Sequence, residues 1–270
     1  FLFLLLIYMI SNSNSIIFSL IIIIIIILYL LYLYSDMVKN NKNKNNKNNK
    51  NHILLLHFDS VKSRKILQVL KSSGANVTEY NPYKDNLTSR KIELYKQCDG
   101  LVISGSNPDV RTIEIPRINI VPFGKSIYGR IERVIDLFQS KGKKIFGICY
   151  GSQLLWHYYG GGCEYRKNVY GHRKGQHYKQ IQVLKPVDDL LKGIGPENKF
   201  NYFRNILLDP DAPPKNARIL ALDETIYEGN KKYNISAFRM GGKRVWGVIF
   251  HPESSMRTGG SVLFNNFLKE

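Results

Sequence analysis

The spacing of apolar and polar positions from residue 52 onward predicts strands that alternate with helices. Short apolar runs at 52–58, 101–104 and 144–148, and an alternating run at 76–80, are typical of strands in a parallel sheet. Helical spacing occurs at 61–73, 127–140, 151–159 and 261–268. More strands are expected at 180–184, 218–221, 236–239 and 245–250. The pattern therefore predicts an α/β fold, with a mostly parallel sheet between two layers of helices, a three-layer α/β/α sandwich.

The first 51 residues follow a different pattern. Residues 1–36 are almost entirely apolar, and 16–34 form an uncharged run close to the ~20 residues that a helix needs to cross a bilayer. Residues 37–51 are mainly Asn and Lys, with too little apolar surface to offset the entropy of ordering, so a disordered linker is expected there. The expected organisation is an apolar segment at 1–36, a linker at 37–51 and one domain at 52–270.

The apolar segment has two interpretations. If 16–34 is a membrane anchor, the lysines that follow it place the domain behind it in the cytoplasm, because positive charge stays on that side. A cleaved signal peptide fits less well, since no positive region precedes the apolar run. Alternatively, residues 1–36 are not translated and Met37 is the natural start, and then no membrane contact is expected. Both interpretations predict a cytoplasmic domain.

Composition narrows the function classes. The formal charge is +18, but outside the Asn/Lys run the basic residues are scattered and no aromatic–basic interleaving accompanies them, so nucleic-acid binding is not expected. The 3 cysteines are an odd number with no regular spacing, which argues against a disulfide framework and favours a reducing compartment. No histidine–cysteine spacing resembles a zinc site, so neither a metal nor another cofactor is expected.

One cysteine stands in a distinctive context. An apolar strand runs into Gly147-Ile148-Cys149-Tyr150-Gly151 and then directly into a helix, which is typical of a nucleophile elbow. Glycines are expected at both flanks because side chains there would clash as the backbone reverses. A helix N-terminus favours the reactive thiolate, and the Tyr150 amide is placed to form half of an oxyanion hole. The pattern predicts that Cys149 is a nucleophile.

A candidate base lies near the C-terminus. The apolar run 245–250 delivers His251 at its carboxyl end, where the active sites of open parallel sheets gather. Glu253 lies two residues on, so in an extended segment it can orient the imidazole to accept the thiol proton. Cys149, His251 and Glu253 are therefore predicted to be a catalytic triad. Structural or solvent-exposed positions are expected for the remaining candidates, Cys98, Cys163, His172 and His177.

These motifs together resemble the class I glutamine amidotransferase family. Its G-x-C-x-G-x-Q and F-H-P-E patterns stand at 147–153 and 250–253, and 99–106 is similar to its D-G-hydrophobic-S-G-G loop. The resemblance covers about 52–270 and implies a flavodoxin-like domain. It implies that Cys149 attacks the side-chain amide of glutamine, giving a γ-glutamyl thioester and ammonia, and that water then releases glutamate. It also implies that Gln153 contacts the substrate and that Gly105 or Ser106 supplies the second oxyanion-hole amide.

Departures from the family pattern leave the substrate open. Ser106 replaces the usual second glycine, which is closer to γ-glutamyl peptidases and γ-glutamyl-amine hydrolases of the same superfamily. Ile249 replaces the glutamine that commonly precedes F-H-P-E, and no H-x-D motif precedes the prolines at 213–214. Three functions are therefore weighed. They are a glutaminase with a separate synthetase that accepts its ammonia, a free-standing hydrolase of γ-glutamyl peptides or amines, and a catalytically silent regulatory protein of the same fold.

Overall fold

The computed structural model describes residues 24–31, 51–105, 124–165, 177–202, 206–227 and 230–270. The chain divides into two compact units, at 1–50 and 51–270. In the first unit, residues 24–31 form an exposed helix. Across the described ranges, no helix combines the length and the apolar character needed to cross a membrane. Most of the predicted anchor at 16–34 lies outside those ranges.

The second unit is built around an eight-stranded sheet in the order β2-β1-β3-β4-β12-β11-β10-β7. The parallel part consists of β1 (His52–Leu56), β2 (Asn76–Tyr80), β3 (Gly100–Ile103), β4 (Lys144–Ile148) and β12 (Val245–Val248). An antiparallel part continues it with β11 (Asn230–Met240), β10 (Ala217–Tyr227) and β7 (Gln182–Val183). Two small antiparallel sheets pair β5 (Cys163–Tyr165) with β9 (Ile206–Leu208), and β6 (His177–Gln180) with β8 (Lys199–Tyr202).

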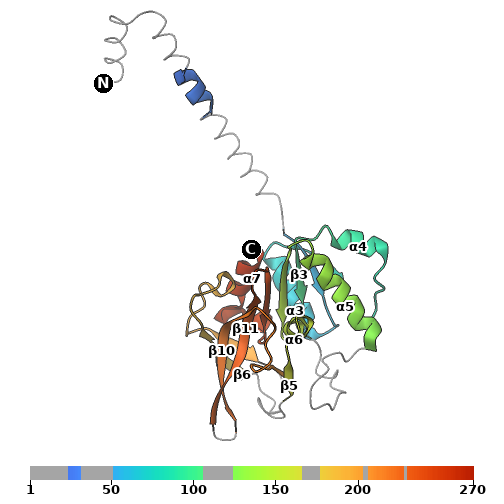
Figure 1. Ribbon diagram of the computed structural model, residues 1–270, viewed down its shortest axis with the longest axis vertical. Helices are drawn as coiled ribbons and strands as arrows, with labels where there is room; N and C mark the ends of the chain where they lie inside the picture. The colour runs from blue at the N-terminus through green and yellow to red at the C-terminus, as the bar shows by residue number, and fades with distance from the viewer. Residues whose placement is uncertain (1–23, 32–50, 106–123, 166–176, 203–205, 228–229) are drawn as a thin grey trace, which may run out of the picture. The chain divides into compact units, whose positions relative to one another are not determined.

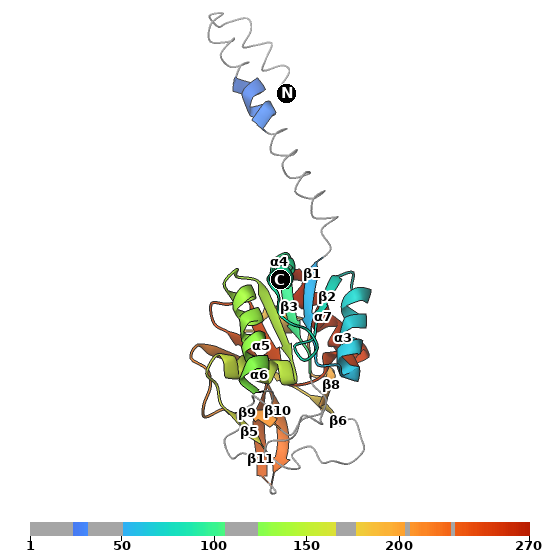
Figure 2. The ribbon, with the colours of Figure 1, turned by 90° about the vertical axis from the view of Figure 1, so that its right-hand side faces the viewer.

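Helices cover both faces of the sheet (Figures 1 and 2). One face packs against α3 (Val61–Ser72) and α7 (Gly260–Lys269), and the other against α4 (Ser89–Tyr95), α5 (Gly124–Gln139) and α6 (Tyr150–Tyr158). Successive side chains of β1 point to opposite faces of the sheet, so both faces are apolar and need a layer of helices. Ile53 and Leu55 enter the first core, while Leu54 and Leu56 enter the second. The predicted three-layer α/β/α fold with a mostly parallel centre is confirmed.

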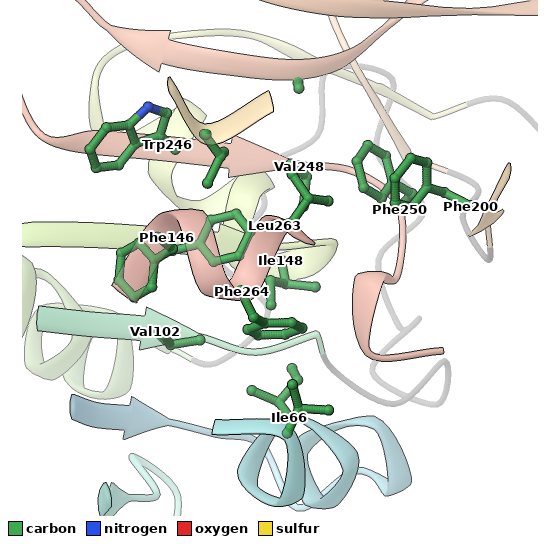
Figure 3. Close-up of a cluster of buried hydrophobic side chains, with 14 of the residues drawn as sticks. Ile66, Val102, Phe146, Ile148, Phe200, Trp246, Val248, Phe250, Leu263 and Phe264 are labelled. Carbon is green, nitrogen blue, oxygen red and sulfur yellow. The ribbon is translucent and has the colours of Figure 1, made fainter. Parts of the chain in front are cut away.

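The core beneath α7 positions the end of β12. Phe146 on β4 meets Phe264 of α7 edge-on, with ring centroids 6.2 Å apart (Figure 3). Further along, the rings of Phe200 and Phe250 stack at 4.2 Å. Phe250 directly precedes His251, and aromatic packing of this kind is worth about 0.5–1.5 kcal/mol beyond burial. The stacked pair therefore fixes the backbone that carries the predicted base.

The structure differs from the predicted elements in its second half. The strand expected at 180–184 is split between β6 and β7, which belong to different sheets, with Ile181 buried between them. The hairpin β10–β11 is much longer than expected. The prediction was too short because the outer part of the hairpin carries exposed charges, such as Glu224, Lys231 and Lys232, which hide the alternation of apolar and polar residues. The helix α4 and the short strands β5, β8 and β9 were not predicted, since segments of three to seven residues are too short to show a clear period.

Candidate active site

The turn from β4 into α6 has the strained geometry of a nucleophile elbow. Cys149 has φ 53° and ψ −108°, in a region that residues other than glycine rarely adopt. A Cβ on Gly147 would lie 2.6 Å from the carbonyl oxygen of Gly151. A Cβ on Gly151 would lie 2.1 Å from the carbonyl oxygen of Ile103 on β3. Both flanking glycines are therefore required by close backbone contacts.

The elbow places Cys149 at the N-terminus of α6. Its carbonyl accepts hydrogen bonds from the amides of Ser152 and Gln153, at 3.0 and 3.1 Å, and its own amide donates to Val248 of β12 at 2.8 Å. A helix N-terminus carries partial positive charge, which favours a thiolate there. Tyr150 is the first residue of α6, where backbone amides have no acceptor within the helix. This placement suits the oxyanion role predicted for its N–H group.

His251 and Glu253 form a buried pair beside the elbow. The His251 Nδ1 atom lies 2.7 Å from Glu253 Oε1, and the two residues are 2% and 4% exposed. The amide of His251 donates to the carbonyl of Asn201 on β8 at 2.8 Å. A Cβ on Gly105 would lie 3.2 Å from His251 Cε1 and 3.4 Å from Cys149 Cβ. Three segments far apart in the chain therefore meet at one point.

Charge at this point favours the protonated form of the His251 imidazole. Burial by itself would lower the pKa of His251, but the charges of Glu253 and Cys149, together with hydrogen bonds to both, raise that pKa to about 10. The surroundings therefore favour the imidazolium form of His251. A thiolate is the nucleophilic form of cysteine, so the arrangement is chemically suited to attack on a carbonyl carbon.

A network of serines holds the loop at Gly105. The carbonyl of Gly105 accepts hydrogen bonds from Ser104 Oγ at 3.0 Å and from Ser60 Oγ at 3.3 Å. Ser63 Oγ bonds with the hydroxyls of Ser60 and Ser104, at 2.9 Å each. The Gly105 peptide is thus fixed beside Cys149. Ser106, the other predicted source of an oxyanion-hole amide, lies outside the described residues.

Comparison with known proteins identifies the family. The family Glutamine amidotransferase class-I matches residues 54–270. The chain belongs to this family. Its similarity to individual members is moderate: a GMP synthase [glutamine-hydrolyzing] of Yarrowia lipolytica is 28% identical over 218 residues, which are 80% of this chain and 34% of that protein. A GMP synthase of Pyrobaculum aerophilum is 33% identical over 128 residues, 47% of this chain and 22% of that one.

A shorter relative matches over almost its full length. The anthranilate synthase component 2 of Methanothermobacter marburgensis is 24% identical over 204 residues, which are 72% of this chain and 96% of that protein. By contrast, the chain spans only about a third or less of the GMP synthases that it matches.

Two solved structures confirm the fold of this amidotransferase domain. A protein of Thermoplasma acidophilum, assigned as one of the subunits of GMP synthase, superimposes with a TM-score of 0.61 at 18% identity, over 82% of this chain and 94% of that one. A glutamine amidotransferase of Thermotoga maritima gives a TM-score of 0.55 at 16% identity, over 80% of this chain and 81% of that one. At such identities the likeness establishes the fold alone.

Gln153 occupies a defined place on the first turn of α6. Its side chain is buried, and its Nε2 donates to the carbonyl of Ile206 on β9 at 3.0 Å. The bond ties the amidotransferase elbow to the small β5–β9 sheet. Contact between Gln153 and a substrate stays a prediction.

One residue near the triad was missed by the sequence analysis. Lys62, in the first turn of α3, donates from Nζ to the hydroxyl of Ser254 at 2.8 Å, and Ser254 directly follows Glu253. The carbonyl of Ser254 accepts from the Tyr178 hydroxyl at 3.2 Å. The available signal was the position of Lys62 just after β1, at the carboxyl edge of the sheet. Many surface lysines share that signal, so it could not single out this one.

The remaining candidates are the two other cysteines and two histidines. Cys98 is fully buried, and burial raises its pKa to about 11. Burial and, next, the charge of Asp209 raise the pKa of Cys163 as well. Both thiols are therefore neutral at physiological pH. His177 begins β6 without a described side chain, and His172 is outside the described ranges. Over those same ranges, no group of His, Cys, Asp and Glu is arranged to hold a metal ion.

Proposed function

We propose that this protein is a glutaminase of the class I amidotransferase type, with Cys149, His251 and Glu253 as its catalytic triad. The juxtaposition of a strained cysteine elbow with a buried His251–Glu253 pair carries the proposal. Membership of the family supports the same chemistry.

The proposed reaction proceeds in two halves. The Cys149 thiolate attacks the side-chain carbonyl carbon of glutamine, and the oxygen that becomes negative is held by the amides of Tyr150 and the Gly105–Ser106 loop. When the C–N bond breaks, His251 gives its proton to the leaving nitrogen, and ammonia departs from a γ-glutamyl thioester. His251 then takes a proton from water, the hydroxide attacks the thioester, and glutamate leaves as the thiolate returns. Glu253 keeps the imidazole oriented throughout.

We further propose that a synthetase partner consumes the ammonia. The names of the relatives support this: GMP synthase [glutamine-hydrolyzing] describes a synthase that hydrolyses glutamine, and anthranilate synthase component 2 describes one component of a synthase. The same names favour glutamine over the γ-glutamyl peptides or amines that the Ser106 loop left open.

A substrate screen with a covalent probe tests these proposals. Glutamate and ammonia are measured with glutamine, glutathione and a γ-glutamyl amine, for the wild-type chain and Cys149→Ala. Turnover of glutamine that vanishes in Cys149→Ala is expected, whereas turnover of γ-glutamyl peptides alone would select the peptidase. A diazoketone analogue of glutamine labels a reactive Cys149 even without the partner, and mass spectrometry of the protein detects the label. A chain that neither turns over nor labels would be the silent regulatory protein.

Localisation follows from the segment that precedes the domain. A cytoplasmic location, with or without an anchor at 16–34, remains our proposal. Membrane fractionation of the full chain and of a chain that begins at Met37 tests the anchor. If 16–34 is an anchor, only the full chain is found in the membrane fraction.

A further inference from the structure

The catalytic triad has an unbalanced charge when it is ready to react. With the proton of Cys149 on His251, the site holds a thiolate, an imidazolium and the Glu253 carboxylate, which leaves one net negative charge. The side chains of His251 and Glu253 are 3% and 0% exposed. Burying a net charge is unfavourable unless a counter-charge lies near.

The carboxylate of Glu253 is only half satisfied by direct contacts. Its Oε1 bonds to His251, while its buried Oε2 has no hydrogen-bond partner within the part of the chain that the structure describes. A desolvated carboxylate oxygen of this kind is stabilised by a cation at longer range, because the field of a charge extends beyond hydrogen-bond distance in a low-dielectric site.

Lys62 supplies a cation at this place. The Ser60 hydroxyl caps α3 by accepting from the amide of Ser63, so the first turn of the helix is fixed beside the Pro252–Ser254 turn. The half-buried Lys62 ammonium is then held by its 2.8 Å bond to the Ser254 hydroxyl. It interacts electrostatically with both Glu253 and Cys149.

We propose that Lys62 is a positioning residue whose ammonium balances the charge of the triad and thereby favours the thiolate–imidazolium pair. The inference rests on the proposed role of Cys149. Lys62 acts through Glu253 and Cys149, and no contact of its own with the substrate is required.

The surroundings of Lys62 act on its charge in two opposite directions, and together they lower its pKa. Burial is the main influence that lowers the pKa of Lys62, and the neighbouring charge of Lys65 acts in the same direction. Glu253 and Cys149 act against them and raise it. Among the described residues, two further titratable groups lie at this place: His251, which follows β12, and Tyr178 on β6, whose hydroxyl donates to the carbonyl of Ser254. The two negative groups of the triad therefore favour the cation that, in turn, favours them.

The test measures the pH dependence of thiol reactivity. The full chain is alkylated with iodoacetamide, an uncharged reagent, from pH 5.5 to 9, and the Cys149 peptide is quantified by mass. For Lys62→Met we expect the midpoint of the rate profile to move upward by about 0.5–1 pH unit, at the lower end for a nearby opposite charge, since Lys62 is only half-buried. Alkylation near pH 6.5 should slow about three- to tenfold.

Two matched variants separate charge from bulk effects. Lys62→Arg keeps the charge and should stay within about twofold of the wild type. Lys71→Met removes an exposed charge from the last turn of the same helix, and it should leave the midpoint unchanged.

A profile of Lys62→Met that overlays the wild type would overturn the inference. So would an unchanged profile combined with a raised KM for glutamine, which would make Lys62 a substrate-binding residue. If Lys62→Met does not fold, Lys62→Arg serves as the test. A midpoint of Lys62→Arg that moves upward as far as was expected for Lys62→Met would also overturn the inference, because the charge is kept in this variant. Loss of the proposed function is recognised separately, by glutamine turnover that persists in Cys149→Ala.

Discussion

Two buried ionisable groups lie at opposite edges of the sheet, Lys144 at the amino end of β4 and His251 just beyond the carboxyl end of the neighbouring β12, and their environments affect charge in opposite ways. At the amino end, Lys144 is 3% exposed, and its ammonium donates to the carbonyl of Leu268 at 2.8 Å and to Asn51 Oδ1 at 3.0 Å. Both acceptors are neutral. Burial, followed by the charge of Arg244, lowers the pKa of Lys144 to about 8.

At the carboxyl end, burial is just as complete but ionisation is favoured. His251 stands between a carboxylate and the thiol of Cys149, and the pKa of the imidazole rises to about 10. The difference shows that burial alone drives a group toward its neutral form, while opposite charges in direct contact reverse that effect.

The polarity of the neighbouring helices accounts for what each end can do. Cys149 lies at the positive start of α6, where negative charge is stabilised. Lys144 instead meets a terminal carbonyl of α7, where positive charge is stabilised, and it ties the end of the chain to Asn51. The carboxyl end is therefore suited to chemistry and the amino end to closing the domain.

The largest effect should come from the cysteine of the carboxyl end. Cys149→Ala should reduce glutamine hydrolysis by at least about 10⁴-fold, because the nucleophile of a covalent mechanism cannot be replaced. Ammonia release is the measurement. Cys98→Ala is the matched control, since its neutral thiol lies in the core and its loss should affect stability more than turnover. Equal losses in the two variants would contradict the assignment.

A smaller loss is expected from the carboxylate that orients the base. Glu253→Gln keeps the size of the side chain but removes its charge, and kcat/KM should fall about 10²- to 10⁴-fold. The pH–rate profile should change as well, because Glu253 raises the pKa of His251. Exposed Glu93→Gln should match the wild type. Undiminished activity in Glu253→Gln would remove it from the triad.

Stability gives the next test of the elbow. Gly151→Ala should lower the free energy of unfolding by about 2–3 kcal/mol or prevent folding, because the added Cβ meets the backbone of Ile103 at 2.1 Å. Gly129→Ala in α5 has open space around it and should instead stabilise by about 0.5–1 kcal/mol. Urea unfolding compares them, and a tolerated Gly151→Ala would show that the elbow can relax.

The smallest effect concerns pH and the amino end. Lys144 has a folded pKa of about 8 against an ordinary 10.5, so the unfolded chain binds more protons between these values and stability rises with pH there. His251 works oppositely: its stabilisation is complete below 6.5 and is lost as pH rises through about 10.

Lys144→Met should remove the contribution that rises with pH, which is a slope of at most about 1.4 kcal/mol per pH unit between pH 8 and 10.5. Urea unfolding at several pH values measures it. Exposed Lys141→Met should leave the slope as it is in the wild type. A steeper rise in Lys144→Met than in the wild type would contradict the sign assigned to Lys144.

The sequence by itself determined the parts of this protein that depend on near neighbours. The strands at 76–80 and 144–148 were predicted at their observed bounds, since five apolar or alternating residues between polar breaks specify a strand locally. The elbow and the pair of His251 with Glu253 were also predicted, because each lies within a few residues of chain. The catalytic roles of these residues stay predictions until the variants are measured.

Only the tertiary structure decided which distant residues meet. Lys62 and Ser254 are 192 positions apart, and Lys144 and Leu268 are 124 apart, so no local period indicates either contact. The burial of Lys144 and the division of 180–184 between two sheets likewise depend on how helices and strands pack, since a side chain's surroundings are set by the layers that close over it. The candidate nucleophile could be predicted from its own segment, whereas the charges around it depend on the fold.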